Sequence, residues 1–248
     1  MTRFFCSLLL CAGAALVWAV PLNAQTFSET QRGEIEGIVK AYLIAHPEVI
    51  QEVMTEIEKR QAEAEVEKHK EGVKQYSKVL FYSPRQVTLG NPDGDVTMVE
   101  FFDYNCGFCR RALADMLDLM KADPKLRVVL KEFPVLGPGS VEAAQVAVAV
   151  RMQDKDGKKY LEFHQKMLTS RGQADRARAL AAAKEVGLDM GRLEKDMASD
   201  EAKETIDENL KMAEALGLNG TPSYVIGTDV VVGAVGLTAL KEKVAAAR

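Results

Sequence analysis

The sequence predicts an α/β domain that carries a helical insertion and follows an N-terminal helical arm. Two patterns predict the domain. Residues 96–133 alternate strand, helix and strand, and residues 224–232 have the composition of a hairpin before a last helix. Between these two patterns, residues 140–216 carry apolar positions at helical spacing. A third observation, the highly charged helical stretch over residues 25–82, predicts the arm.

Composition limits the classes of protein to consider. The chain has 248 residues, of which 47% are hydrophobic and 27% are charged. These values are those of an ordinary globular protein, so they exclude collagen, bulk disorder and a polytopic membrane protein. The formal net charge is −4, which does not favour a nucleic-acid partner, because such a partner calls for a basic face.

The first 24 residues have the layout of a secretory signal peptide. Arg3 precedes an uncharged and mostly apolar run over residues 4–20, and the segment ends on the small Ala24. This layout predicts export, with cleavage after Ala24. The alternative is an uncleaved membrane anchor, for which a run of this length is at the short limit.

The arm is expected over residues 25–82 as two helices. Ser28 and Gln31 have the spacing of a capping box, and His46–Pro47 separates the helices. Apolar residues keep helical spacing up to Ile57, but the apolar stripe nearly disappears between residues 59 and 74. Two alternatives stay open: a solvated linker helix, or a narrow oligomerisation seam like that of a coiled coil.

The main domain is expected over residues 83–248, with its helical insertion at about 140–216. Turn residues and apolar runs predict the elements in order, and Gly187 and Gly217 end helices within the insertion. The expected elements are a short edge strand at 86–89, a buried strand at 96–102, a helix after Cys106 that ends at Asp123–Pro124, a strand at 126–133, the hairpin strands 224–226 and 230–232, and a helix at 237–247.

Cleavage of the signal peptide removes Cys6 and Cys11 and leaves Cys106 and Cys109, which are separated by Gly107 and Phe108. Cys106 directly follows a buried strand and opens a helix. Unpaired N–H groups and the positive end of the helix dipole stabilise a thiolate there, so we expect its pKa to fall from ~8.5 to ~3.5–7.

The position of each thiol predicts its role. Cys106 is then the nucleophile, Cys109 resolves the mixed disulfide, and Gly107 and Phe108 tune the balance between them. Other uses of the pair are a zinc site, a Cu(I) site and a structural disulfide. A zinc site would need two further ligands, which the sequence does not offer near the pair. A structural disulfide that closes so short a loop would add little stability. Cu(I) suits two thiolates and remains the metal alternative.

A second motif, Thr221–Pro222, lies where the helical insertion returns to the sheet. Proline cannot donate a ladder hydrogen bond, so its position at the start of a strand is unusual. A cis bond would leave the backbone of Thr221 free to pair with an extended substrate. The alternative is a plain trans turn.

These motifs together resemble the DsbA branch of the thioredoxin superfamily, over about residues 86–248. The residues that carry the resemblance are Glu100-Phe-Phe, then Cys106-Gly-Phe-Cys109, then Gly220-Thr-Pro222. The charged N-terminal helices and the segment over 131–140 are similar to ScsC-like bacterial proteins. The resemblance implies a thioredoxin fold, a cis Pro222 that docks substrate with Thr221, and a buried acid at Glu100 that relays protons to Cys109. The alternative for Glu100 is an ordinary sheet-edge carboxylate.

The resemblance also implies an activity: a periplasmic protein thiol–disulfide oxidoreductase without a dissociable cofactor. Its substrates are cysteine-containing exported proteins, and a membrane partner resets it, either a DsbD/ScsB-like reductant or a DsbB-like oxidant. Gly107-Phe108 and Thr221 differ from the Pro-His pair and the Val of DsbA and are similar to isomerases and reductases. We therefore expect a homo-oligomeric isomerase or reductase, by resemblance a trimer.

Three alternatives to an isomerase remain: a DsbA-type oxidase, a copper-binding periplasmic protein for copper tolerance, and a cell-envelope interaction protein whose arm matters more than its thiols.

Overall fold

The computed structural model describes residues 27–248. The signal peptide predicted over residues 1–24, with Cys6 and Cys11, lies outside the described residues. The chain divides into two compact units after Ile57.

The first unit contains α1 (Glu29–Ala45) and the beginning of α2 (Pro47–Tyr82). The predicted capping box is confirmed: Ser28 Oγ accepts the Gln31 N–H at 3.3 Å, and the Gln31 side chain accepts the Ser28 N–H at 2.9 Å. The break at His46–Pro47 is confirmed as well, since His46 caps α1 and Pro47 begins α2. No residue of α1 is buried, so its apolar side chains lie exposed within this unit.

The second unit begins at Glu58, well before the boundary expected at residue 83. The last turns of α2 explain this difference. Val73 and Leu80 are buried among residues of β2, β3 and α8, and Tyr76 and Val79 pack against the same cluster. An added Cβ at Gly72 would lie 2.8 Å from the carbonyl oxygen of Ala215, so glycine allows α2 to approach the end of α8 closely. The apolar stripe that fades after Ile57 returns here and places one face of the end of α2, with Val73 and Leu80, in the domain core.

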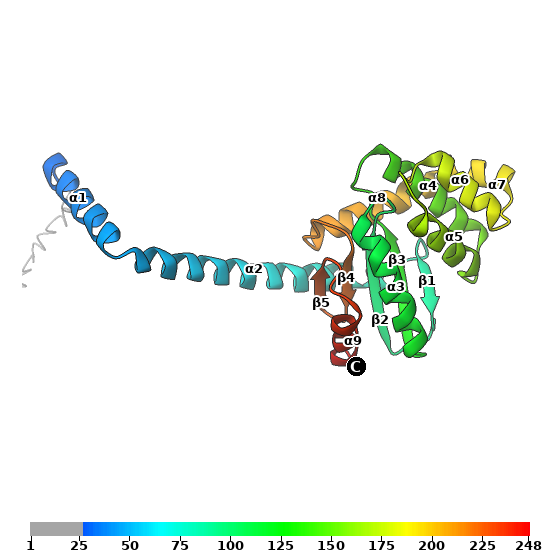
Figure 1. Ribbon diagram of the computed structural model, residues 1–248, viewed down its shortest axis with the longest axis horizontal. Helices are drawn as coiled ribbons and strands as arrows, with labels where there is room; N and C mark the ends of the chain where they lie inside the picture. The colour runs from blue at the N-terminus through cyan, green and yellow to red at the C-terminus, as the bar shows by residue number, and fades with distance from the viewer. Residues whose placement is uncertain (1–26) are drawn as a thin grey trace, which may run out of the picture. The chain divides into compact units, whose positions relative to one another are not determined.

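The sheet has five strands in the order β1-β3-β2-β4-β5 (Figure 1). β2 and β3 are parallel, and the other neighbours are antiparallel. The predicted strand–helix–strand unit is confirmed, with α3 (Gly107–Ala122) connecting the two parallel strands, and β1 is an edge strand as predicted. The strands are β1 (Val87–Gly90), β2 (Val96–Phe102), β3 (Leu126–Glu132), β4 (Ser223–Ile226) and β5 (Asp229–Val232).

The helical insertion lies between β3 and β4, and α9 (Leu237–Ala246) closes the chain. In Figure 1 the helices α4 to α7 gather beside one end of the sheet. The insertion consists of α4 (Pro138–Gln153), α5 (Lys158–Thr169), α6 (Arg176–Glu185), α7 (Met190–Met197) and α8 (Asp200–Ala215).

Different helices cover the two faces of the sheet. Successive side chains of a strand point to opposite faces. Met98 and Phe102 therefore belong to a cluster with α3 and α9, whereas Val99 and Phe101 pack with α2 and α8. The same alternation places Glu100 on the face that α3 covers. The strand pattern thus brings this acid to the side of the sheet that carries both cysteines.

Candidate active site

Cys106 occupies the N-cap of α3, directly after the turn that follows β2. Its backbone N–H donates to the carbonyl of Asp103 at 3.0 Å. Its Sγ accepts the backbone N–H of Cys109 at 3.4 Å, which is the contact of a capping side chain with the first helical turn. The end of the strand and the start of the helix therefore fix the sulfur over unpaired N–H groups.

The two thiols are both free and have opposite acidities. A hydrogen bond from the Cys109 thiol is the main cause that lowers the pKa of Cys106 to about 5, helped by hydrogen bonding with the Thr221 side chain and opposed by burial. The same bond to Cys106, together with burial, raises the pKa of Cys109 far above that of a free thiol. Cys106 is 6% exposed and Cys109 is 0% exposed. At neutral pH the outer sulfur is thus a thiolate and the inner one a thiol.

Thr221 and Pro222 lie beside Cys106, although 115 positions of sequence separate Thr221 from that cysteine. Cys106 Sγ lies 3.1 Å from the carbonyl oxygen of Thr221, to which it donates only when it is protonated. The Thr221–Pro222 peptide bond is cis, and the Pro222 carbonyl accepts the Gly233 N–H at 2.8 Å. The motif that opens β4 and the cysteine turn that follows β2 therefore form one site.

Glu100 is buried in the middle of the sheet, with 2% of its surface exposed. Because β2 lies between β3 and β4, the alternative of an ordinary sheet-edge carboxylate is wrong. Burial, with smaller contributions from the charges of Cys106 and Asp115, raises the pKa of Glu100 to about 8. Its Oε2 atom has no hydrogen-bond partner in the described part of the chain. A neutral acid thus lies close enough to both sulfurs to be coupled to them electrostatically.

Gly107 and Phe108 form the outer edge of the site. Phe108 is 56% exposed, and the guanidinium of Arg111 lies 4.4 Å from the centre of its ring. A Cβ added at Gly107 would meet nothing within 4 Å, so the space beside the two cysteines is open. An apolar ring and an open backbone therefore flank the sulfur of Cys106.

Sequence reasoning missed two groups that the fold brings to this site. Tyr224 pairs with Glu100 across β2 and β4, and burial together with the charges of Glu100 and Cys109 raises its pKa. The only sequence signal was its place two residues after Pro222. Asp103 is 1% exposed and lies between the buried strand and Cys106. Its sequence signal was an acidic residue directly after the apolar strand that precedes Cys106.

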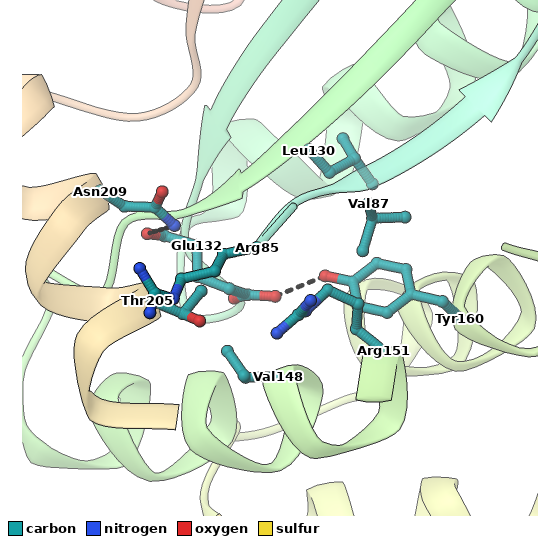
Figure 2. Close-up of a pocket in the computed structure, with 9 residues that line it drawn as sticks. All are labelled: Arg85, Val87, Leu130, Glu132, Val148, Arg151, Tyr160, Thr205 and Asn209. Carbon is teal, nitrogen blue, oxygen red and sulfur yellow. Dashed lines mark hydrogen bonds between the residues drawn. The ribbon is translucent and has the colours of Figure 1, made fainter. Parts of the chain in front are cut away.

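A small polar cavity of about 10 Å³, room for one water molecule, lies elsewhere in the second unit, between β1, β3, α4, α5 and α8 (Figure 2). In its wall Tyr160 donates to the buried Glu132, whose pKa burial raises. Arg151 Nε and Asn209 Oδ1 have no hydrogen-bond partner among residues 27–248. Neither cysteine and neither residue of the Thr221–Pro222 motif lines this cavity, so it is separate from the thiol site.

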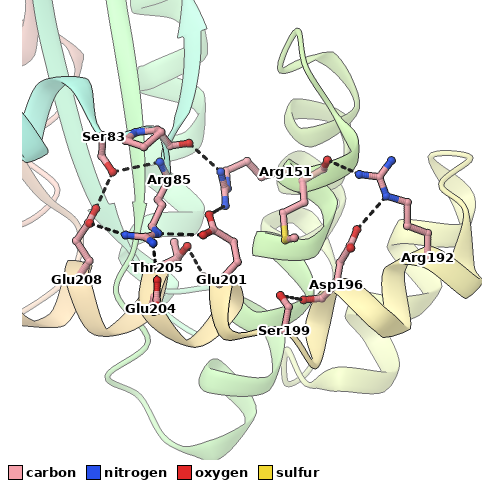
Figure 3. Close-up of polar contacts among 12 residues, drawn as sticks. Ser83, Arg85, Arg151, Arg192, Asp196, Ser199, Glu201, Glu204, Thr205 and Glu208 are labelled. Carbon is pink, nitrogen blue, oxygen red and sulfur yellow. Dashed lines mark hydrogen bonds and ion pairs between the residues drawn. The ribbon is translucent and has the colours of Figure 1, made fainter.

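An ion-pair network ties the insertion to the segment after α2 (Figure 3). Arg85 donates to Glu201 at 3.0 Å and also pairs with Glu204 and Glu208, while Arg151 donates to Glu201 at 2.7 Å. Neither Cys106 nor Cys109 takes part in these contacts, so the network connects α4 and α8 with the segment after α2 and has no catalytic arrangement.

Residues 27–248 contain neither a metal-binding cluster nor a membrane-spanning helix. No group of three or more His, Cys, Asp or Glu side chains in this range is arranged to hold a metal ion. In the same range, each helix is too short or too polar to cross a membrane.

Comparison with known proteins agrees with this geometry. The model of the DSBA-like thioredoxin domain family matches residues 97–245, and that of the copper resistance protein ScsC N-terminal domain matches residues 31–64. A probable disulfide bond formation protein D of Bacillus cereus is 28% identical over 60% of this chain and 73% of its own length.

Two solved structures extend the comparison. A thioredoxin-like oxidoreductase from Silicibacter pomeroyi is 44% identical, with a TM-score of 0.65 over 69% of this chain and 96% of its own. A linker-deletion mutant of Proteus mirabilis ScsC is 25% identical, with a TM-score of 0.68 over 91% of this chain and 98% of its own. The chain therefore belongs to the DSBA-like thioredoxin domain family and is a thiol–disulfide oxidoreductase of the DsbA/ScsC type.

Proposed function

We propose that this protein is a periplasmic disulfide isomerase and reductase of exported proteins, with Cys106 as its nucleophile. The observation that carries the proposal is the pair of opposite acidities at one helix start. A thiol with a pKa of about 5 is a thiolate at neutral pH, and the thiolate is the reactive form. The buried Cys109, whose pKa is raised, keeps its proton until it is needed.

The reaction runs in two exchanges. The Cys106 thiolate attacks one sulfur of a client disulfide, forms a mixed disulfide and releases the other client sulfur as a thiolate. For reduction, Cys109 loses its proton and attacks Cys106, which closes the Cys106–Cys109 disulfide and frees the second client thiol. For isomerisation, a client thiolate attacks the mixed disulfide instead, and Cys106 leaves unchanged as a thiolate. A reductant in the membrane returns the closed pair to two thiols.

Three neighbouring groups have roles in this scheme. Thr221, whose carbonyl lies 3.1 Å from Cys106 Sγ, docks the client backbone together with Pro222. The exposed ring of Phe108 offers an apolar contact at the edge of the site. Glu100 takes the proton from Cys109 in the molecules in which its own carboxyl is ionised, and its pKa of about 8 keeps such molecules accessible near neutral pH.

The N-terminal arm supports isomerisation over oxidation. Apolar residues of α1 such as Ile38 and Ile44 are 69% and 70% exposed. Their burial against a second copy of the chain would stabilise an oligomer. Linking several catalytic units through such arms raises the concentration of active thiolates at one misfolded client. We therefore propose a homo-oligomer, with a trimer as the form that the resemblance implies.

The test is refolding of scrambled ribonuclease. The mature chain that starts at residue 25 should be an oligomer by light scattering and should restore ribonuclease activity. Deletion of residues 25–57 should give a monomer that still exchanges small thiols but loses most isomerase activity. The deletion ends there because Val73 and Leu80 belong to the core of the second unit. A monomeric mature chain would contradict the role of the arm.

Two alternatives give different results in the cell. Thiol trapping should find Cys106 and Cys109 reduced, whereas an oxidase would be held oxidised. A copper carrier would use the same two thiolates, and the match of residues 31–64 to a copper resistance protein domain is the observation that favours it. Such a carrier would copurify with copper and would show no activity on scrambled ribonuclease.

A further inference from the structure

The turn between β2 and Cys106 is tied to distant parts of the chain through Asp103 and Asn105. We infer that Asp103 is a positioning residue for the thiol site: it holds the Cys106 turn and the exposed pair Val135–Leu136 in one rigid frame. In this frame an apolar segment of an unfolded client contacts Val135 and Leu136 while its disulfide meets Cys106. The inference rests on the proposed function and adds a client-contacting surface to it.

The carboxylate of Asp103 is saturated with donors from both sides of the frame. Oδ1 accepts the backbone N–H of Asn105 at 2.8 Å and the Ser140 hydroxyl at 2.7 Å. Oδ2 accepts the backbone N–H groups of Val135 at 2.9 Å and Leu136 at 3.0 Å. The backbone carbonyl of the same residue accepts the Cys106 N–H. One buried side chain therefore fixes the cysteine turn and the loop after β3 at the same time.

Asn105 extends the frame to the helical insertion. Its side chain accepts the N–H of Ala174 at 2.7 Å and donates to the carbonyl of Ala174 and the hydroxyl of Ser140, both at 2.9 Å. A Cβ added at Gly139 would lie 2.9 Å from the Ala174 carbonyl oxygen, so glycine permits this close contact between α4 and the loop before α6. The turn, the loop after β3 and the insertion thus form one hydrogen-bonded unit.

Val135 and Leu136 show what this unit presents to a client. Their backbone N–H groups point inward to Asp103, yet their side chains are 45% and 50% exposed. Two adjacent apolar side chains on a backbone that is held by charge-assisted hydrogen bonds lose little conformational entropy when they bind. Unfolded proteins, unlike folded ones, expose apolar segments that such a surface can contact.

The frame needs a carboxylate and not merely a polar side chain. Four donors converge on Asp103, and an ionised carboxylate accepts four hydrogen bonds without offering a proton. In Asp103→Asn, the amide NH2 would face two of these donors, either the pair from Val135 and Leu136 or the pair from Ser140 and Asn105. The shape of the side chain is kept, so the change removes the charge and two of the hydrogen bonds without leaving a void.

The experiment measures second-order rate constants of the reduced mature chain with two disulfides, scrambled ribonuclease and a small aromatic disulfide. Asp103→Asn should lower the rate with ribonuclease about tenfold. The rate with the small disulfide should fall much less, so the ratio of the two rates separates loss of client contact from loss of Cys106 reactivity, and the pKa of Cys106 should shift by well under one unit. Leu136→Ser, at an exposed position, should reproduce the loss. Because Asp103 acts through that pair, the double variant should be no slower than the slower single variant.

Asn209→Ala is the matched control, because it removes a buried amide that donates to the Glu132 carbonyl, away from both cysteines. An equal loss in this variant would reduce Asp103 to a general contributor to stability and overturn the inference. Additive losses in the double variant, or a shift of about one unit in the pKa of Cys106, would overturn it as well. A parent chain that reacts with neither disulfide would instead contradict the proposed function itself.

Discussion

Replacement of Glu100 by glutamine should change how the stability of the reduced protein depends on pH. Glu100 is 2% exposed, and burial is the main cause that raises its pKa from 4.5 to about 8. Between these two values the folded chain keeps a proton that the unfolded chain has lost. The free energy of unfolding contributed by this group is therefore fully present below pH 4.5 and falls as the pH rises towards 8. Glutamine does not titrate, so Glu100→Gln removes this slope.

The size of the effect follows from the shift. Each pKa unit corresponds to about 1.36 kcal/mol, so a displacement from 4.5 to about 8 amounts to roughly 5 kcal/mol in full. Over a range of about two and a half pH units between these values, the variant should gain roughly 3 kcal/mol relative to the parent chain. Cys106 and the buried Glu132 are present in both chains, so their own titrations largely cancel in the difference.

Denaturant unfolding of both reduced chains at a series of pH values from 5 to 7.5 measures this difference. The two curves of unfolding free energy against pH should diverge, with the variant becoming the more stable one. Parallel curves would refute the reasoning, because they would mean that Glu100 is ionised in the folded protein. The same variant should slow closure of the Cys106–Cys109 disulfide by about a hundredfold, since positioned general bases contribute on the order of that factor.

Two further substitutions test the packing of α2. Gly72→Ala should lower the free energy of unfolding by roughly 1–3 kcal/mol, because its Cβ would lie 2.8 Å from the Ala215 carbonyl oxygen. This loss should outweigh the better helix propensity of alanine. Gly37→Ala, where the Cβ meets nothing within 4 Å, is the control in denaturant unfolding and should show no loss. Lys131 is 0% exposed, donates to the Val79 carbonyl at 3.0 Å, and has a pKa that burial lowers to about 8. The unfolded chain therefore binds more protons between pH 8 and 10.5, so the parent chain should gain roughly 3 kcal/mol over Lys131→Met across that range. A constant difference between the two chains would contradict the lowered pKa of Lys131.

The elements that local patterns predict well are those around Cys106. The apolar run of β2, the turn residues and the apolar spacing of α3 all lie within a few residues of one another, so the sequence places Cys106 at a helix start without knowledge of the rest of the fold. The capping box at Ser28 is equally local. The meeting of Cys106 with Thr221 could be expected only from the family resemblance, because 115 positions separate the two residues.

The features that escaped prediction depend on contacts between distant segments. The end of α2 looked like part of a solvated arm, because its apolar stripe returns only after Gly72. These apolar side chains are buried only because α2 packs on β2 and α8, which are distant in sequence. Asp103 looked like an ordinary turn residue, because the groups that it binds at Val135, Leu136 and Ser140 are more than thirty positions away. Neither burial nor these partners can be read from the local sequence.

The central claim is that Cys106 is the reactive thiolate of this protein, and its titration tests that claim most directly. The rate of alkylation of the reduced mature chain should be followed against pH, with the modified residue identified by mass spectrometry. Label should appear on Cys106, with a midpoint at a pH of about 5, while Cys109 stays unmodified at neutral pH. A midpoint near that of a free thiol, or first labelling at Cys109, would contradict it.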